Sequence, residues 1–266
     1  MNYWKLLEKA DTEKNHPAVW KMPGKTTEGN ILFYNGAALQ IGKETSKLTK
    51  EKVLLIIGRR VLEASGEVIM ESLKKAGIEY DVFSDISAEP DLDTAKKVAS
   101  VMDSYQYGAV IGVGGGSTLD IAKLAAHGGD GKLIERILTN NFSKPRVPVL
   151  LLPTTSGTGS EVSPYIVLTV NGVKKFFTSS EFLPVTAIVD PLLTVSMNAR
   201  TTAATAFDAM THGIEGYMAC ATPYTECLAV ESTVVIMKYL ERAVETAEDI
   251  EARYWLAYGS VLGMMS

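Results

Sequence analysis

Cysteines and long apolar runs are scarce in this sequence. Cys220 and Cys227 are the only two cysteines among 266 residues. Two are too few for a disulfide framework or a zinc cluster, so we expect both to be reduced structural thiols. No segment approaches the roughly 20 consecutive apolar residues of a membrane-spanning helix, and the amino terminus lacks the apolar stretch of a signal peptide. The sequence therefore predicts a cytoplasmic protein with no membrane partner.

An excess of basic residues is also missing. The 26 lysines and arginines are outnumbered by 31 acidic residues, which gives a net charge of −5. Nucleic-acid surfaces need clustered positive charge, so we expect no nucleic-acid partner. The hydrophobic residues make up 46% and the charged residues 21% of the chain, a balance typical of globular proteins. The length is enough for one large domain or two ordinary ones.

The middle of the chain has the pattern of a parallel sheet. After an irregular start, short apolar runs alternate with helical patterns between about Val53 and Leu152. We expect strands at 53–58, 78–83, 109–114 and 147–152, and helices at 66–77, 91–105 and 117–129. Asn171 and Gly172 join two further strands and predict a type I′ hairpin. The sequence thus predicts an α/β fold with a Rossmann-like parallel sheet.

The last part of the chain differs in composition and in its hydrophobic pattern. From about Thr201 it is rich in alanine, threonine and methionine at helical spacing, with almost no strand pattern. We therefore predict an α/β domain at residues 1–190 and the first helices of an all-helical domain at residues 191–266. The apolar helical spacing continues up to Ser266, so we expect the sequence to stop inside a helix.

A glycine-rich segment, GVGGGSTLD at 112–120, lies at a predicted strand-to-helix turn. Glycines let the backbone approach a phosphate, and the helix amino terminus attracts its charge. Ser117 and Asp120 have the spacing of a capping box. Ser117 also stands where the dinucleotide fingerprint has its third glycine, so we predict a different kind of phosphate loop. The alternative is an ordinary glycine-rich turn.

A hydroxyl-rich segment, PTTSGTGSE at 153–161, directly follows a predicted buried strand. The carboxyl edge of a parallel sheet is where such folds bind ligands, and hydroxyl groups can bind a phosphate, a ribose or an amide. The segment therefore predicts a second part of a ligand site. The alternative is a solvated loop.

A carboxylate and an imidazole lie one turn apart in a predicted helix. Asp208 and His212 share one face of that helix, and Glu215 continues the stripe. This spacing lets two side chains converge on a divalent cation. The alternative is an ion pair or hydrogen bond on the helix surface.

The motifs GGGSTLDIAK, PTTSGTGSE, the DP of AIVDP and DAMTHGIE, in this order, resemble the iron-containing (group III) alcohol dehydrogenases over nearly the whole chain. The resemblance implies a dehydroquinate-synthase-like architecture with a nucleotide-binding α/β domain and an all-helical metal-binding domain. It implies that a cofactor and a catalytic iron or zinc ion meet between them, with Asp208 and His212 as the first two metal ligands. The cofactor residues it implies are Gly114, Gly115, Gly116, Ser117, Asp120, Thr154, Thr155, Thr158 and Lys175.

The resemblance further implies an oxidoreductase that interconverts an alcohol and an aldehyde by hydride transfer with NAD(P), the metal acting as a Lewis acid. Members of the family have two further histidine ligands. Here the sequence ends before them, and His16 and His127 match neither position. We therefore expect a truncated member that binds metal weakly. The alternative is a non-enzymatic nucleotide-binding fragment, and a homo-oligomer is an expected assembly.

The end of the first predicted strand bears on the choice of cofactor. Relatives that use NAD commonly carry an aspartate there, which binds the ribose 2′-hydroxyl. This sequence has Gly58, followed by Arg59 and Arg60. Guanidinium groups match phosphate geometry, so the resemblance favours NADP over NAD. The alternative is that the two arginines lie at a solvated loop edge.

Overall fold

The structure is a computed structural model, and it describes residues 2–10, 18–21, 29–87, 89–219 and 222–266. The predictions that concern His16 and Cys220 lie outside these residues. Cys227 is free, and its side chain is exposed. None of the helices in the described part of the chain combines the length and hydrophobicity that crossing a bilayer requires.

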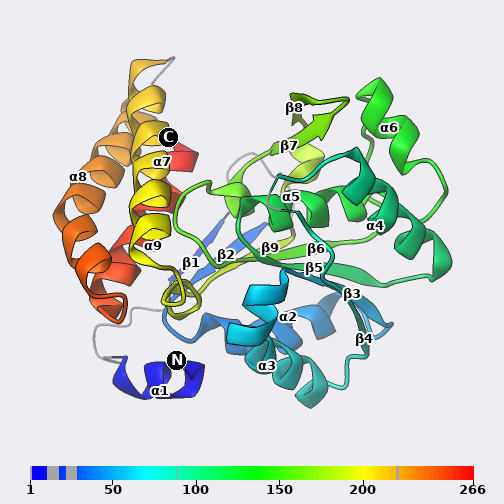
Figure 1. Ribbon diagram of the computed structural model, residues 1–266, viewed down its shortest axis with the longest axis horizontal. Coiled ribbons are helices and arrows are strands. Elements are labelled where there is room, and N and C mark those ends of the chain that lie inside the picture. Colours follow the sequence, from blue (N-terminus) through cyan, green and yellow to red (C-terminus); the bar gives the residue numbers. More distant parts are fainter. Residues whose placement is uncertain (1, 11–17, 22–28, 88, 220–221) are drawn as a thin grey trace.

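A single large sheet lies at the centre of the α/β part (Figure 1). In the described residues it has seven strands in the order β1-β2-β9-β6-β5-β3-β4. Their bounds are β1 Ala18–Lys21, β2 Asn30–Phe33, β3 Val53–Ile57, β4 Tyr80–Phe83, β5 Ala109–Gly114, β6 Val149–Pro153 and β9 Thr186–Val189. All neighbours pair in parallel except β1 with β2. The predicted Rossmann-like parallel sheet is confirmed.

Helices cover both faces of this sheet, so β3, β5 and β6 are buried throughout and consist almost entirely of apolar residues. One face packs against α4 (Leu92–Ser104), α5 (Gly116–Ala125) and α6 (Leu133–Thr139). The other packs against α1 (Tyr3–Lys9), η1 (Ala37–Gln40), α2 (Ile41–Leu48) and α3 (Arg59–Lys75). The chain therefore changes face between α3 and α5, which follow the adjacent strands β3 and β5. Open α/β sheets bind ligands at such a switch point.

The part of the amino-terminal segment that the structure describes is mostly regular, and the prediction of an irregular start was wrong for these residues. It contains α1, β2, η1 and α2, and β2 pairs in parallel with β9. Asp190, directly after β9, is fully buried and fixes this segment. Its carboxylate accepts hydrogen bonds from the Tyr3 hydroxyl at 2.5 Å and from the N–H groups of Gly36 at 3.0 Å, Ala38 at 3.0 Å and Leu192 at 3.1 Å.

Two predicted helix starts also need correction. Helix α3 begins at Arg59, directly after Gly58, rather than at Gly66. Helix α5 has Gly115 as its N-cap and no side-chain cap, so the capping box was wrong. The Asp120 carboxylate instead accepts hydrogen bonds from the Ser160 hydroxyl and the Val167 N–H, which lie far along the chain.

The hairpin is present where it was predicted. Strands β7 (Tyr165–Val170) and β8 (Val173–Thr178) pair in antiparallel register. Asn171 and Gly172 have φ angles of 53° and 76°, as a type I′ turn requires. One face of the hairpin packs into the core with Ile166, Leu168 and Phe177. The other face of the hairpin therefore points away from this core.

The carboxyl-terminal part is helical, as predicted. Helices α7 (Ala199–Met218), α8 (Pro223–Glu245) and α9 (Ile250–Met265) pack together at one side of the sheet (Figure 1). Three short 3-10 helices complete the chain: η2 (Ser160–Val162) lies between β6 and β7, η3 (Ser180–Phe182) between β8 and β9, and η4 (Pro191–Thr194) connects β9 to α7. Helix α9 packs against Phe33 of β2 through Tyr254 and Tyr258. The domain division between residues 190 and 191 stays a prediction.

Candidate functional site

A cavity of about 760 Å³ lies between the carboxyl edge of the sheet and helix α7. This volume is within the range of small-molecule sites. Three separate parts of the sequence line it: Gly116 and Ser117 at the start of α5, Thr158 and Ser160 in the hydroxyl-rich loop, and Asp208 and His212 on α7. The three motifs that the sequence pointed to therefore meet at one place.

The glycine turn lets the hydroxyl-rich loop approach α5 closely. A Cβ atom on Gly116 would lie 2.8 Å from the Thr158 side chain, and one on Gly115 would lie 3.4 Å from Thr155. The N-cap residue of α5 is Gly115, which makes no side-chain cap of the first turn. This helix amino terminus therefore faces the cavity with backbone N–H groups that are suited to an anion such as a phosphate.

The hydroxyl-rich loop joins the sheet to the helical part. At its start, the N–H of Thr154 donates to the carbonyl of Gly114 at 2.9 Å, so the loop begins as an extension of the β5–β6 pairing. A Cβ on Gly157 would lie 2.7 Å from Thr205 of α7. One on Gly159, whose φ is 55°, would lie 2.3 Å from Met264 of α9. Glycine at these positions lets the loop lie directly against both helices.

Asp208 and His212 are the candidate metal ligands. Both line the cavity from α7, and the Nδ1 atom of His212 is buried without a hydrogen-bond partner. A carboxylate and an imidazole are ligands that suit iron or zinc. Among the residues that the structure describes, no group of three or more His, Cys, Asp or Glu side chains could hold an ion. The two side chains thus fit a metal as part of a ligand set that the described residues do not complete.

Comparison with known proteins identifies the family. The family model "Iron-containing alcohol dehydrogenase" matches residues 28–191, and the model for the carboxyl-terminal domain of the same family matches residues 202–266. The chain belongs to the iron-containing alcohol dehydrogenase family. The resemblance inferred from the motifs is confirmed.

Curated and solved members of this family are similar to the chain over most of its length. It is 38% identical to long-chain-alcohol dehydrogenase 1 of Geobacillus thermodenitrificans, over 85% of this chain and 59% of the relative. NADH-dependent butanol dehydrogenase A of Thermotoga maritima superposes with a TM-score of 0.82 at 29% identity, covering 93% of this chain and 63% of the other. A sulfoacetaldehyde reductase of Bifidobacterium kashiwanohense, solved in complex with NAD+, gives 0.82 at 30% identity, covering 88% and 64%. The chain thus spans less than two thirds of these relatives.

Some residues that the family resemblance implied lie outside the cavity. Gly58 does not line it and lies beside the first turn of α5, where a Cβ on Gly58 would be 3.8 Å from the Thr118 hydroxyl. The Arg59 guanidinium is exposed, 3.9 Å from the Asp85 carboxylate.

On the hairpin, Lys174 lines the cavity and Lys175 does not, because neighbouring residues of β8 face opposite sides. The Lys174 ammonium lies 3.0 Å from the Glu89 carboxylate. The structure therefore places Lys174 at the cavity wall, and a cofactor contact by Lys175 stays a prediction.

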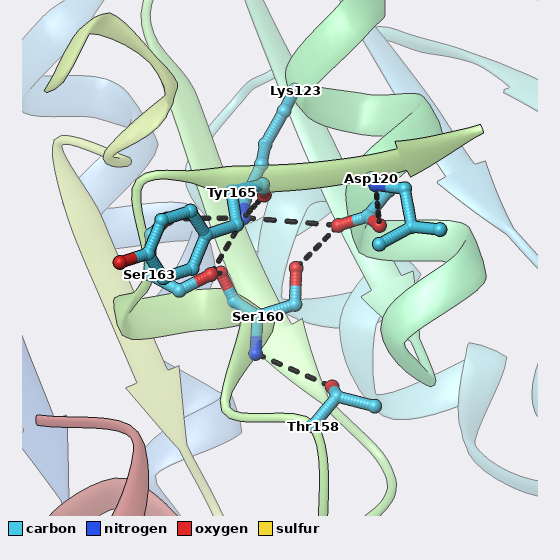
Figure 2. Close-up of polar contacts among 7 residues, drawn as sticks. Asp120, Lys123, Thr158, Ser160, Ser163 and Tyr165 are labelled. Carbon is cyan, nitrogen blue, oxygen red and sulfur yellow. Dashed lines mark hydrogen bonds and ion pairs between the residues drawn. The ribbon is translucent and has the colours of Figure 1, made fainter. Parts of the chain in front are cut away.

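Sequence reasoning missed a buried charged cluster beside the cavity, formed by Asp120, Lys123 and Glu161. Burial lowers the pKa of Lys123 to about 8, raises that of Glu161 to about 7 and raises that of Asp120. Figure 2 shows Asp120 and Lys123 reaching from α5 toward the hydroxyl-rich loop and β7. The available signal was the pair of Asp120 and Lys123, which are the only charged residues of helix α5 and lie one turn apart.

An aromatic wall was also missed. Tyr165 and Phe176 line the cavity from the open face of the hairpin, with ring centroids 4.9 Å apart. Strand alternation would have placed both on the face opposite Ile166 and Phe177.

Proposed function

We propose that this protein interconverts an alcohol and an aldehyde by transferring a hydride to or from a nicotinamide dinucleotide. One observation carries the proposal: a single cavity is lined by the glycine turn, the hydroxyl-rich loop and the Asp208–His212 pair. The curated and solved relatives described above are named as alcohol dehydrogenases or an aldehyde reductase, which supports the same reaction class. The substrate in this proposal is a small-molecule alcohol or aldehyde.

Each lining element has a role in this proposal. Gly115, Gly116 and Ser117 hold the cofactor pyrophosphate at the amino terminus of α5, where the helix dipole favours negative charge. Thr155 and Thr158 lie against that turn and bind the nicotinamide side. The cavity wall at Tyr165 and Phe176 excludes water from the reacting atoms.

The metal in this proposal is a divalent iron or zinc ion held by Asp208 and His212. Such an ion stabilises the alkoxide form of an alcohol and polarises an aldehyde carbonyl as a Lewis acid. The second candidate function is a nucleotide-binding module without catalysis. It is favoured by the incomplete ligand set among the described residues.

Metal binding tests the enzyme proposal. We expect the wild-type chain to bind Zn²⁺ or Fe²⁺ weakly, because one carboxylate and one imidazole leave most coordination positions to other groups. Asp208→Asn should weaken binding by more than about 10-fold, since even the outer partners of a ligand contribute about 10- to 100-fold. Glu241→Gln is the control, because it removes a carboxylate charge from α8 outside the cavity.

Calorimetry with each ion, together with NADPH fluorescence with and without the ion, measures both steps. Dinucleotide binding without turnover at any metal concentration would favour the non-catalytic module. If the chain bound neither dinucleotide, both candidate functions would be refuted.

We also propose that the cofactor is NADP rather than NAD. Gly58 directly follows β3, lies near Thr118 in the first turn of α5 and lacks the carboxylate that repels a 2′-phosphate. The two solved relatives are described with NADH or NAD+, so this preference would distinguish the present chain from them.

Gly58→Asp should therefore change the ratio of the NADPH and NADH dissociation constants by about 10-fold in favour of NADH, or about 1.4 kcal/mol. The new side chain has room, because the nearest atom to its Cβ is the Thr118 hydroxyl at 3.8 Å. Fluorescence titration with both dinucleotides measures the ratio. Gly58→Asn adds the same volume without charge, and an equal shift in that variant would show that the carboxylate is not the cause.

For the assembly and compartment we keep the sequence-based expectations of a homo-oligomer in the cytoplasm. Exposed apolar side chains on α7 and α8, such as Ile214, Met218 and Met237, support self-association.

A further inference from the structure

We infer that Asp120 and Lys123 are positioning residues that hold the hydroxyl-rich loop and strand β7 in a fixed place beside the glycine turn. They lie one turn apart on α5, the helix that begins with that turn. The consequence for cofactor binding rests on the function proposed above. The structural part, a charged clamp between α5 and the loop, stands on the contacts themselves (Figure 2).

Lys123 is used entirely for contacts within the protein. Its side chain is fully buried. Its ammonium donates to the carbonyls of Ser163 at 3.1 Å and Tyr165 at 2.8 Å, and to the Ser163 hydroxyl at 3.3 Å. An ammonium group has three protons, so these three acceptors satisfy it. The lysine therefore fixes the backbone where the loop enters β7.

Asp120 holds the same segment at two other points. Its Oδ1 accepts a hydrogen bond from the Ser160 hydroxyl at 2.7 Å, and its Oδ2 accepts one from the Val167 N–H at 2.9 Å. Oδ1 also lies 3.7 Å from the Lys123 ammonium. Although Asp120 borders the cavity, both of its oxygens bind protein groups. This assigns it a positioning role in place of the cofactor contact expected from the motif.

The clamp lies next to the hydroxyl-rich loop and the glycine turn, which we propose bind the cofactor. Its anchor points at residues 160, 163, 165 and 167 follow Thr158, whose hydroxyl accepts a hydrogen bond from the Ser160 N–H at 3.3 Å. Thr158 in turn packs against Gly116. A loop fixed in this way loses less conformational entropy when it binds a ligand. Loosening the clamp should therefore weaken dinucleotide binding without removing any atom that the dinucleotide contacts.

The buried charges of Asp120 and Lys123 stabilise each other. Removing one alone leaves the other buried without its counter-charge, which destabilises strongly. The informative variant is thus the double substitution Asp120→Asn with Lys123→Met, which removes both charges and nearly conserves volume. We expect its melting temperature to exceed that of Lys123→Met alone. Leu73→Ala, on the buried face of α3 and away from the loops, is the control for lower stability as such.

Hydrogen exchange by mass spectrometry measures the clamp, and fluorescence titration with NADPH and NADH measures its consequence. In the double variant we expect exchange in residues 160–167 to become at least about 10-fold faster, and both dissociation constants to rise by about 10-fold, equivalent to about 1.4 kcal/mol. Leu73→Ala should change neither at a temperature well below its melting point.

Unchanged exchange in residues 160–167 would overturn the clamp. Faster exchange with unchanged dissociation constants would overturn its role in cofactor binding. A wild-type chain that binds neither dinucleotide would refute the proposed function instead, and the exchange measurement alone would then decide whether Asp120 and Lys123 hold the loop.

Discussion

Replacing Asp190 with alanine should lower the free energy of unfolding by about 5 kcal/mol, the largest loss that we expect from a single substitution outside the cavity. The carboxylate accepts hydrogen bonds from three backbone N–H groups and the Tyr3 hydroxyl, and it is fully buried. Alanine would leave all four donors without an acceptor in a region closed to water. Each unsatisfied buried donor costs about 1–3 kcal/mol, and partial relaxation keeps the total below the sum.

Chemical denaturation of the variant and the wild type gives this difference. Tyr3→Phe is the control, since it removes a single hydrogen bond and should cost only about 1 kcal/mol. If Asp190→Ala cost no more than Tyr3→Phe, the backbone hydrogen bonds would not be the main contribution. The DP motif would then need another explanation.

The second large effect is a dependence of stability on pH. In the wild type it is small, because His127 and Glu161 contribute to it with opposite signs. Burial between Phe142 and Phe182 lowers the pKa of His127 from 6.5 to about 4. Between these pH values the unfolded chain binds the extra proton, so stability is lost as pH falls. Burial raises the pKa of Glu161 from 4.5 to about 7. Here the folded chain binds the extra proton, so stability is gained as pH falls from about 7 toward 4.5.

Each contribution amounts to about 3 kcal/mol at its limit, and the two have opposite signs. In Glu161→Gln only the effect of His127 remains, so the free energy of unfolding of this variant should fall by about 2 kcal/mol when the pH is lowered from 7 to 5. In His127→Phe, which suits the aromatic surroundings, only the effect of Glu161 remains. The free energy of unfolding of this variant should therefore rise when the pH is lowered from 7 to 5. Urea denaturation at both pH values measures the two slopes. Slopes of the same sign in both variants would contradict this account.

The parts of the fold that the sequence predicted are those whose information is local. Strands β3, β5 and β6 are buried on both faces, so their residues form unbroken apolar runs. The hairpin was predictable because Asn171 and Gly172 tolerate positive φ. The glycine turn and the Asp208–His212 spacing were recognisable because few residues serve those purposes.

The missed parts depend on partners far along the chain. Strand β2 is short, and its residues form a strand because β9 lies beside them. Asp120 has the spacing of a capping residue, yet the hydroxyl and N–H groups that it binds come from 160 and 167. Lys174 and Lys175 differ only in which face of β8 they occupy, and a one-residue shift reverses that assignment. No local pattern carries this information.

The pairing of β2 with β9 sets an order for folding during synthesis. β2 leaves the ribosome before β9, its parallel neighbour in the sheet, by roughly 150 residues, or about 10–30 s at bacterial and eukaryotic elongation rates. Ile31 and Phe33 are completely buried in the finished protein, but during that interval they lack the residues of β9 and α9 that pack against them. The newly made amino-terminal segment therefore exposes apolar surface until β9 has emerged, and it is most prone to aggregation during that interval.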